Sequence, residues 1–438
     1  MPLYQRIAIA QESSFGSPDA NGKPDASGLT YLLSRAERLE VITSGDDLAS
    51  EDNRGRAGPY NFPSIPQTTF NGSPGFDARL RRSGTLEVTM VWYGYGARTP
   101  GPAAHPAHMI LTSSLADAGD PTNTTDTWEG VSATQITSTA AGSSFRTGDL
   151  YGVTVGGTYE VAHLTRTVDG ASGLYVSPAL STTLAASTSV RALRCIYLDN
   201  DLKTGTAAER TAAGNDRPNS LAIRLDGIDH DRQKVRTYMV GARMQSARLT
   251  VADRLVKWTF TIYSPFIYDD HSNAAVTDPT DTPGPALHAL GSSVVISDHI
   301  TGTAPAELGR TALNADANGI EVAIEFEEMR ELGATSNALG CYDVEPINPA
   351  VTASVPLTQY VSALDEDFTD QKQRHLQLTF APGGASQGTG GAVEVTAGTY
   401  LSSPSKRPQV LEMTQGKHTG DNSGGPAANS PFVIGFGM

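Results

Sequence analysis

The stretch IEVAIEFE, residues 320–327, alternates apolar and polar side chains along its whole length. Side chains with a period of two lie on opposite faces of an extended chain. The apolar face carries Ile320, Val322, Ile324 and Phe326, and the opposite face carries Glu321, Ala323, Glu325 and Glu327. The stretch therefore predicts a β-strand with one face in a core and one acidic face in solvent.

The same period recurs on both sides of this stretch. Residues 84–93, GTLEVTMVWY, alternate with one exception at Val91, and residues 248–263 alternate on either side of Asp253-Arg254, which predicts a hairpin. Glycine (44) and proline (26) are spread along the 438 residues, as expected for short strands joined by tight turns. Further strands are predicted at 351–357, 376–380, 393–395 and 432–434. We predict a mainly β protein.

One segment has helical spacing instead. Residues 103–116, AAHPAHMILTSSLA, place Ala107, Ile110 and Leu111 at positions that share a helix face, and Pro106 is tolerated in a first turn. His105 and His108 are three residues apart, and we expect them to be solvated or to cap the helix. The segment predicts one α-helix flanking the sheet.

Changes in composition divide the chain. Residues 131–195 are rich in Thr, Ser, Val and Gly, with turn signals at Gly148-Asp149 and Asp169-Gly170, which predicts a small inserted β domain. The two halves of the chain show a similar order of predicted strands, so a duplicated β module is one of two possible arrangements. The expected parts are 1–130, the first part of a β domain with a long loop at 43–82 and the helix; 131–195, the insertion; 196–268, the completion of the first module; 269–318, a Pro-containing linker or excursion; and 319–438, a second module or the remaining sheet.

Charge and motifs exclude several functions. The net charge of −15 repels phosphate, so a tight sequence-specific nucleic-acid binder is not expected. The sequence contains no nucleophile elbow, phosphate loop, HExxH or CxxC motif, and Cys195 and Cys341 match no metal spacing, so we expect no catalytic residues, no bound metal and no cofactor. The segment DGIDHDR, 226–232, could hold Mn²⁺ or Ca²⁺, but a turn is favoured. No secretory signal and no membrane span are expected.

Two kinds of surface residue indicate contacts between molecules. The loop at 43–82 carries apolar side chains without a regular period, which favours docking on a neighbouring copy over an internal flap. These side chains are Tyr60, Phe62, Ile65, Phe70 and Phe76, followed by the basic residues Arg79, Arg81 and Arg82. Acidic partners or lumen-lining residues are expected at Glu321, Glu325, Glu327, Asp365, Glu366 and Asp367. The alternative for Arg79, Arg81 and Arg82 is a basic surface patch that contacts only solvent.

The order of several segments resembles the tail tube (major tail) proteins of long-tailed bacteriophages. The segments that carry the resemblance are SGTLEVTMVWYG (83–94), AAHPAHMILTSSLADAG (103–119), VGARMQSARLTVADRLVKWTFTIYS (240–264), IEVAIEFEEMRELGATSNALG (320–340) and INPAVTASVPLTQYV (347–361). The segment at 148–180 resembles small β insertions within such proteins. The resemblance covers most of the chain through strand order and short motifs.

The resemblance implies a tail-tube-type β-sandwich or barrel whose sheets join edge to edge into stacked rings. A ring would be a hexamer, or a trimer of a doubled module, around a negative channel through which DNA passes transiently. The implied setting is a virion tail assembled in the cytoplasm of a bacterial host, with tape-measure, tail terminator and baseplate proteins as further partners. Two alternatives stay open: another virion β-sandwich (head decoration, tail terminator or baseplate ring), and a carbohydrate-binding or hydrolytic β protein.

Overall fold

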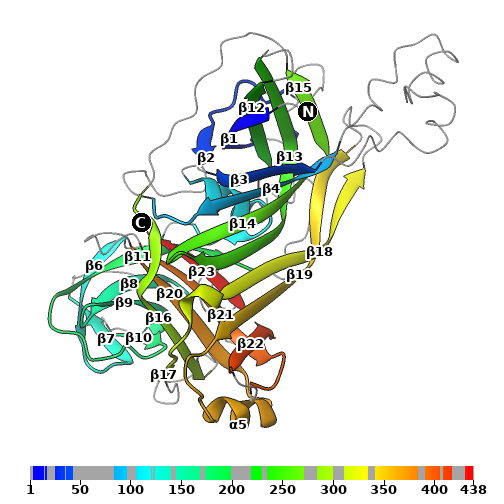
Figure 1. The fold of residues 1–438 in the computed structure, drawn as a ribbon. Helices are drawn as coiled ribbons and strands as arrows, with labels where there is room; N and C mark the ends of the chain where they lie inside the picture. Colours follow the sequence, from blue (N-terminus) through cyan, green and yellow to red (C-terminus); the bar gives the residue numbers. More distant parts are fainter. Residues whose placement is uncertain are drawn as a thin grey trace, which may run out of the picture.

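Strands dominate the structure, a computed structural model (Figure 1). It describes residues 3–13, 15–16, 25–34, 36–42, 83–95, 105–119, 121, 124–139, 145–167, 173–198, 219–228, 234–270, 284–298, 310–333, 341–382, 390–404, 408–416 and 430–437. Of these residues 65% lie in strands and 6% in helices, so the predicted mainly β class is confirmed. No helix in these ranges is long and apolar enough to cross a membrane.

Eight antiparallel strands close into the main barrel. In spatial order they are β13 (Lys234–Ala252), β14 (Leu255–Ser264), β16 (Leu287–Asp298), β20 (Arg374–Pro382), β21 (Gly391–Tyr400), β22 (Val410–Gln415), β19 (Cys341–Pro356) and β18 (Glu321–Gly333), which returns to β13. A large apolar cluster fills the core, where the ring of Trp92 lies 5.6 Å from that of Trp258 and 5.8 Å from that of Phe380. Burial of this apolar surface is the main force that holds the barrel together.

The alternating segments form strands as predicted. In β18, Val322 and Ile324 are buried while Glu325 and Glu327 are exposed. The hairpin of β13 and β14 turns at Asp253-Arg254, and both residues have positive φ angles, as a tight two-residue hairpin turn requires. The predicted hairpin is therefore confirmed.

Strands from the two expected modules mix within this one barrel. Ala247 of β13 lies opposite Ile324 of β18, so residues 319–438 supply the remaining strands of the same sheet rather than a separate module. The segment 269–318, predicted as a linker or an excursion, contains a barrel strand, because β16 from that segment pairs with β20, and β17 (Arg310–Ala312) pairs with β16. Because prolines lie on both sides of β16, the sequence pattern indicated a linker or an excursion there instead of a strand.

A second sheet lies at one end of the barrel. It runs in the order β2 (Leu32–Ser34), β1 (Leu3–Gln11), β12 (Leu221–Ile228), β13, β15 (Phe266–Asp270), so β13 belongs to both sheets. The strand changes sheet near Gly241, whose φ of 64° suits glycine. A Cβ atom there would lie 2.8 Å from the ring of Phe15, and the Gly241 N–H donates to Oε2 of buried Glu12 at 3.0 Å.

Two more strands widen the barrel sheet beside β14. β4 (Gly84–Val91) pairs with β14, and β3 (Ala36–Ile42) pairs with β4. Ile42 lies opposite Thr85, so the ends of β3 and β4 that flank residues 43–82 lie side by side. The strand predicted at 84–93 is confirmed, ending at Val91.

The predicted helix is present but shorter than expected. α3 (Pro106–Thr112) has Pro106 in its first turn and contacts β1, β13 and β14 with every residue buried. Nδ1 of His105 accepts a hydrogen bond from the His108 backbone N–H at 3.3 Å, so the capping role is confirmed for His105. The alternative prediction, that the two histidines are solvated, is wrong, since each is fully buried. A second short helix, α5 (Ala363–Thr369), was not predicted.

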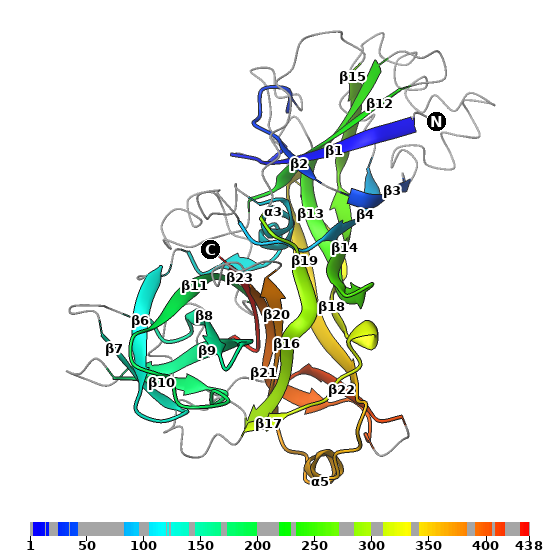
Figure 2. The same ribbon diagram turned by 60° about the vertical axis from the view of Figure 1, so that its left-hand side comes forward.

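The inserted β domain is a small six-stranded barrel beside the main one (Figure 2). Its strands are β6 (Thr125–Gly130), β7 (Gln135–Ser138), β10 (Gly173–Ser177), β9 (Thr158–Thr167), β8 (Leu150–Val155) and β11 (Thr188–Tyr197), which pairs with both β8 and β6. The barrel has its own core around Trp128 and Tyr151. β11 also pairs with β5 (Ala116–Asp117) and with β23 (Phe432–Gly437), and β23 pairs with β21, which ties the insertion to the main barrel.

Candidate functional site

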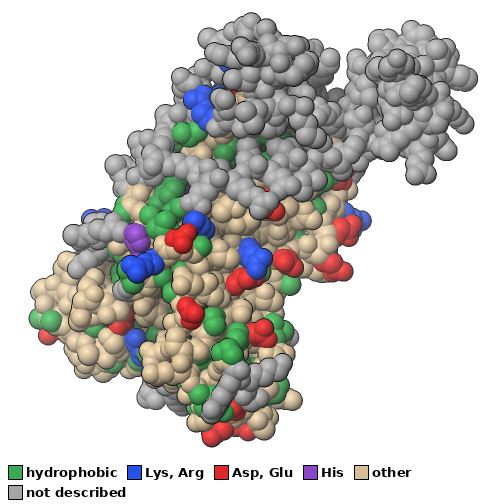
Figure 3. Space-filling view, viewed as in Figure 1, with side chains coloured by type: hydrophobic (Ala, Val, Ile, Leu, Met, Phe, Trp, Pro, Cys, Tyr) green, Lys and Arg blue, Asp and Glu red, His purple; other side chains and the backbone are tan. Residues whose placement is uncertain are grey.

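The acidic face predicted on β18 lies on the surface of the main barrel. Glu325 and Glu327 are exposed, and Asn348 Nδ2 donates to Glu327 Oε2 at 2.7 Å. Glu321 is half-buried and pairs with Arg248 of the neighbouring strand β13. Acidic side chains, with basic ones among them, gather over the β18–β19 hairpin (Figure 3). This strand therefore presents a net negative surface that is partly neutralised at Glu321.

The second acidic group lies on α5, at one end of the barrel and away from the middle of β18 (Figures 1 and 2). Glu366 is exposed, and the hydroxyl of Tyr360 donates to half-buried Asp365. Asp367 is only 5% exposed, and its carboxylate accepts hydrogen bonds from Arg374 Nε and Nη2 at 2.7 and 2.6 Å. Its prediction as a lumen or interface residue is wrong, because a buried carboxylate paired with arginine is a structural ion pair.

The predicted docking residues of the long loop lie outside the described residues. They are Tyr60, Phe62, Ile65, Phe70, Phe76, Arg79, Arg81 and Arg82. Their contact with a neighbouring copy stays a prediction.

Several strands are paired on one side only within the described part of the chain. β3 pairs there with β4 alone, and β15 pairs with β13 alone. The free side of an edge strand presents a row of backbone N–H and C=O groups that can pair with another strand. These edges could join with a second copy of the chain.

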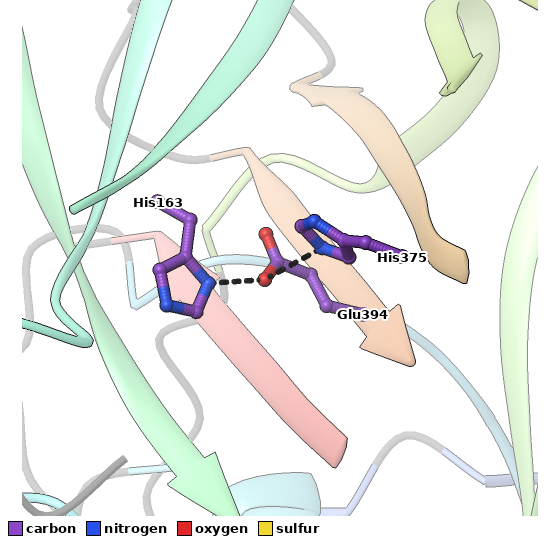
Figure 4. A group of neighbouring side chains, drawn as sticks. All are labelled: His163, His375 and Glu394. Atoms are coloured by element: carbon purple, nitrogen blue, oxygen red, sulfur yellow. Dashed lines mark hydrogen bonds and ion pairs between the residues drawn. The ribbon is translucent and has the colours of Figure 1, made fainter. Parts of the chain in front are cut away.

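A buried polar cluster, His163, His375 and Glu394, lies between the two barrels. His163 is on β9 of the small barrel, while His375 is on β20 and Glu394 is on β21 of the main barrel. Nδ1 of His163 lies 2.6 Å from Oε2 of Glu394, and Nε2 of His375 lies 3.3 Å from the same oxygen (Figure 4). All three side chains are at most 1% exposed.

The second oxygen of Glu394 is also engaged. Gln377, two residues after His375, donates from Nε2 to Glu394 Oε1 at 2.7 Å and to the Val161 carbonyl oxygen at 3.0 Å. Burial by itself raises the pKa of Glu394, but the hydrogen bond with His163 and the close approach of the His163 and His375 rings together outweigh it and hold that pKa well below its usual value. Glu394 is therefore ionised at neutral pH.

Two imidazoles and one carboxylate could hold a metal ion. Among the described residues, this is the grouping of His, Cys, Asp and Glu side chains whose ligand atoms all lie within 4.8 Å of one another. The DGIDHDR segment does not provide such a site in its described part, because Asp226 pairs instead with Arg6 and Arg224. Cys195, whose side chain the structure describes, is buried and forms no disulfide there, and burial raises the pKa of its thiol.

Sequence reasoning missed this cluster. Its members lie far apart in the chain and match no motif spacing. One signal was present: Gln377 and Glu394 are polar residues flanked by apolar residues within predicted strands, in LQL and VEV. A buried charged residue in a core strand requires a partner, which here comes from another barrel.

Searches of protein-family models and of curated protein sequences find no match to this chain. The structural features that bear on function are the acidic strand, the sheet edges and the buried cluster.

Proposed function

We propose that the chain is a structural protein of a bacteriophage virion, which assembles through its sheet edges into rings that stack as a tail tube for DNA passage. The observation that carries the proposal is the one-sided pairing of β3 and β15 within the described part of the chain, beside a closed barrel. The barrel is the rigid unit, and the edges are the surfaces that a second copy completes.

Edge pairing gives a physical reason to assemble. An unpaired strand edge favours uncontrolled aggregation unless it is covered or completed. Addition of a strand from a neighbour satisfies the backbone groups and fixes the angle between copies. In a closed ring every copy provides and receives an edge, so assembly stops at a defined number of subunits.

The acidic strand suits a channel for DNA. Glu325 and Glu327 project from β18 into solvent, and a carboxylate surface repels phosphate at distances up to about 10 Å at 0.1 M salt. DNA would then pass without lasting contact. The small barrel, with its own closed core, is placed on the outside of the tube in this proposal, because a narrow lumen has no room for it.

The segment 43–82 provides a direct test of stacking. Because Ile42 and Thr85 lie opposite each other, a short turn can replace residues 43–82 without stretching β3 or β4. The proposal expects this variant to fold and form rings that no longer elongate, as seen by negative-stain microscopy. A control variant that removes residues 418–428 should still form long tubes. Tubes of normal length from the first variant would contradict the role of this segment.

A further inference from the structure

We propose that His163, His375 and Glu394 bind one Zn²⁺ ion, which clamps the small barrel to the main barrel. The ligand atoms are Nδ1 of His163, Nε2 of His375 and Oε2 of Glu394. The clamp is independent of tube assembly, because it lies within one chain.

The donor set matches the metal. Zn²⁺ is bound in proteins by imidazole nitrogen and carboxylate oxygen, and in sites with only three protein ligands a water molecule completes the tetrahedron. Two such ligand atoms lie about 3.4 Å apart when both bonds are near 2.1 Å and the angle is tetrahedral. The 3.3 Å between His375 Nε2 and Glu394 Oε2 already fits this spacing. The 2.6 Å between His163 Nδ1 and Glu394 Oε2 must widen by under an ångström.

His375 provides a separate reason to expect a ligand. Its ring is fully buried, and neither of its nitrogens has a hydrogen-bond partner among the described residues. Nε2 faces Glu394 Oε2 only as an ion pair. Buried polar groups without partners are rare in native proteins, and a bound ion is one of the recognised reasons for them. A metal bond to Nε2 gives this nitrogen a partner.

Gln377 supports the carboxylate in the way that metal sites require. It donates to Glu394 Oε1 and to the Val161 carbonyl oxygen, so it holds the carboxylate while Oε2 points toward both histidines (Figure 4). Hydrogen bonds to a ligating side chain orient it, and their loss typically weakens metal affinity about 10–100-fold.

Binding requires a rearrangement of one proton and leaves the site with one net positive charge. The neutral His163 ring keeps its one proton: this proton is carried on Nε2 when Zn²⁺ binds, and the lone pair of Nδ1, which now faces Glu394 Oε2, becomes a ligand. The carboxylate offsets one of the two positive charges of the ion. β9 contacts β16 and β20, so a metal ion held by His163 from β9 and by His375 and Glu394 from the main barrel would join the two barrels.

The test uses the full chain without a polyhistidine tag. The protein is dialysed against a chelator, and Zn²⁺ is then added in an isothermal titration, with metal content measured by mass spectrometry after gel filtration. We expect one Zn²⁺ per chain and a higher thermal unfolding midpoint for the loaded protein. Wild-type protein that retains no stoichiometric Zn²⁺ would overturn the proposal.

Variants locate the site. His375→Gln should reduce bound Zn²⁺ to background, and Gln377→Leu should weaken affinity about 10–100-fold. His288→Gln is the control, because His288 is a half-buried strand histidine outside the cluster, and it should keep one Zn²⁺ per chain. Circular dichroism checks that each variant folds. A folded His375→Gln protein that still binds one Zn²⁺ would also overturn the proposal.

A spectrum of the wild-type protein gives a readout that does not depend on variant folding. Co²⁺ substituted for Zn²⁺ should give the strong visible absorption of a low-coordinate nitrogen and oxygen site. The weak spectrum of hydrated Co²⁺ would contradict the assignment.

Discussion

Nδ1 of His163 and Oε2 of Glu394 lie 2.6 Å apart, although the two residues are separated by 231 positions in the chain. The contact joins the small barrel to the main barrel. Arg310 makes a second link, from Nη1 to Glu160 Oε2 at 2.9 Å and to the Ala179 carbonyl oxygen at 2.7 Å. Charged hydrogen bonds, one buried and one half-buried, therefore fix the insertion in one orientation.

Glu394→Gln should lower the free energy of unfolding by about 2–4 kcal/mol in chelator, because it removes a buried charge that His163 and His375 face. Urea unfolding measures this change. Glu325→Gln is the matched control on an exposed strand position and should change stability by less than about 0.5 kcal/mol. Equal effects of the two substitutions would contradict a structural role for the cluster.

Stability should fall as the pH drops below the usual histidine value, and His108 should cause part of this loss. Burial, then Arg194 and His105, lowers the pKa of His108 well below its usual value, and its ring stacks on Phe436. Below a pH of about 6.5 the unfolded chain binds a proton there that the folded chain does not, so stability decreases by up to about 1.4 kcal/mol per pH unit.

The measurement compares urea midpoints at neutral and mildly acidic pH. Wild-type protein should lose more stability on acidification than His108→Gln, which cannot bind that proton. Parallel pH profiles for the two proteins would rule out His108 as the source.

Gly241→Ala should destabilise the protein by about 1–3 kcal/mol, because the positive φ disfavours alanine and its Cβ would meet the Phe15 ring. Gly28→Ala is the control, since no atom lies within 4 Å of a Cβ there. The comparison is made by thermal or urea unfolding. If both variants match wild type, the bend of β13 does not depend on glycine.

Reversal of charge on β18 should make the assembled protein hold DNA. Glu325→Lys with Glu327→Lys removes the repulsive surface in the proposed channel, so DNA retention should rise and should fall again with added salt. Glu129→Lys reverses an exposed charge on β6 of the small barrel, and it should not change retention. Filter binding with labelled DNA measures the effect. Greater retention by the Glu129 variant would place the channel elsewhere.

The half-buried strands could be predicted because one face of each packs in the core while the other meets water, as in β4, β14 and β18. Strand β16 could not, since LHALGSSVVISD has no regular period and prolines surround it. The pairing of β13 with β18 depends on contacts between distant segments, which local patterns do not contain. The cluster of His163, His375 and Glu394 escaped prediction for the same reason.

Negative-stain electron microscopy of the purified full chain at increasing protein concentration tests the central claim most directly. The proposed assembly predicts rings with a central hole, of six copies or of three, that stack into hollow filaments. A particle that stays a compact monomer at the highest concentration would contradict it.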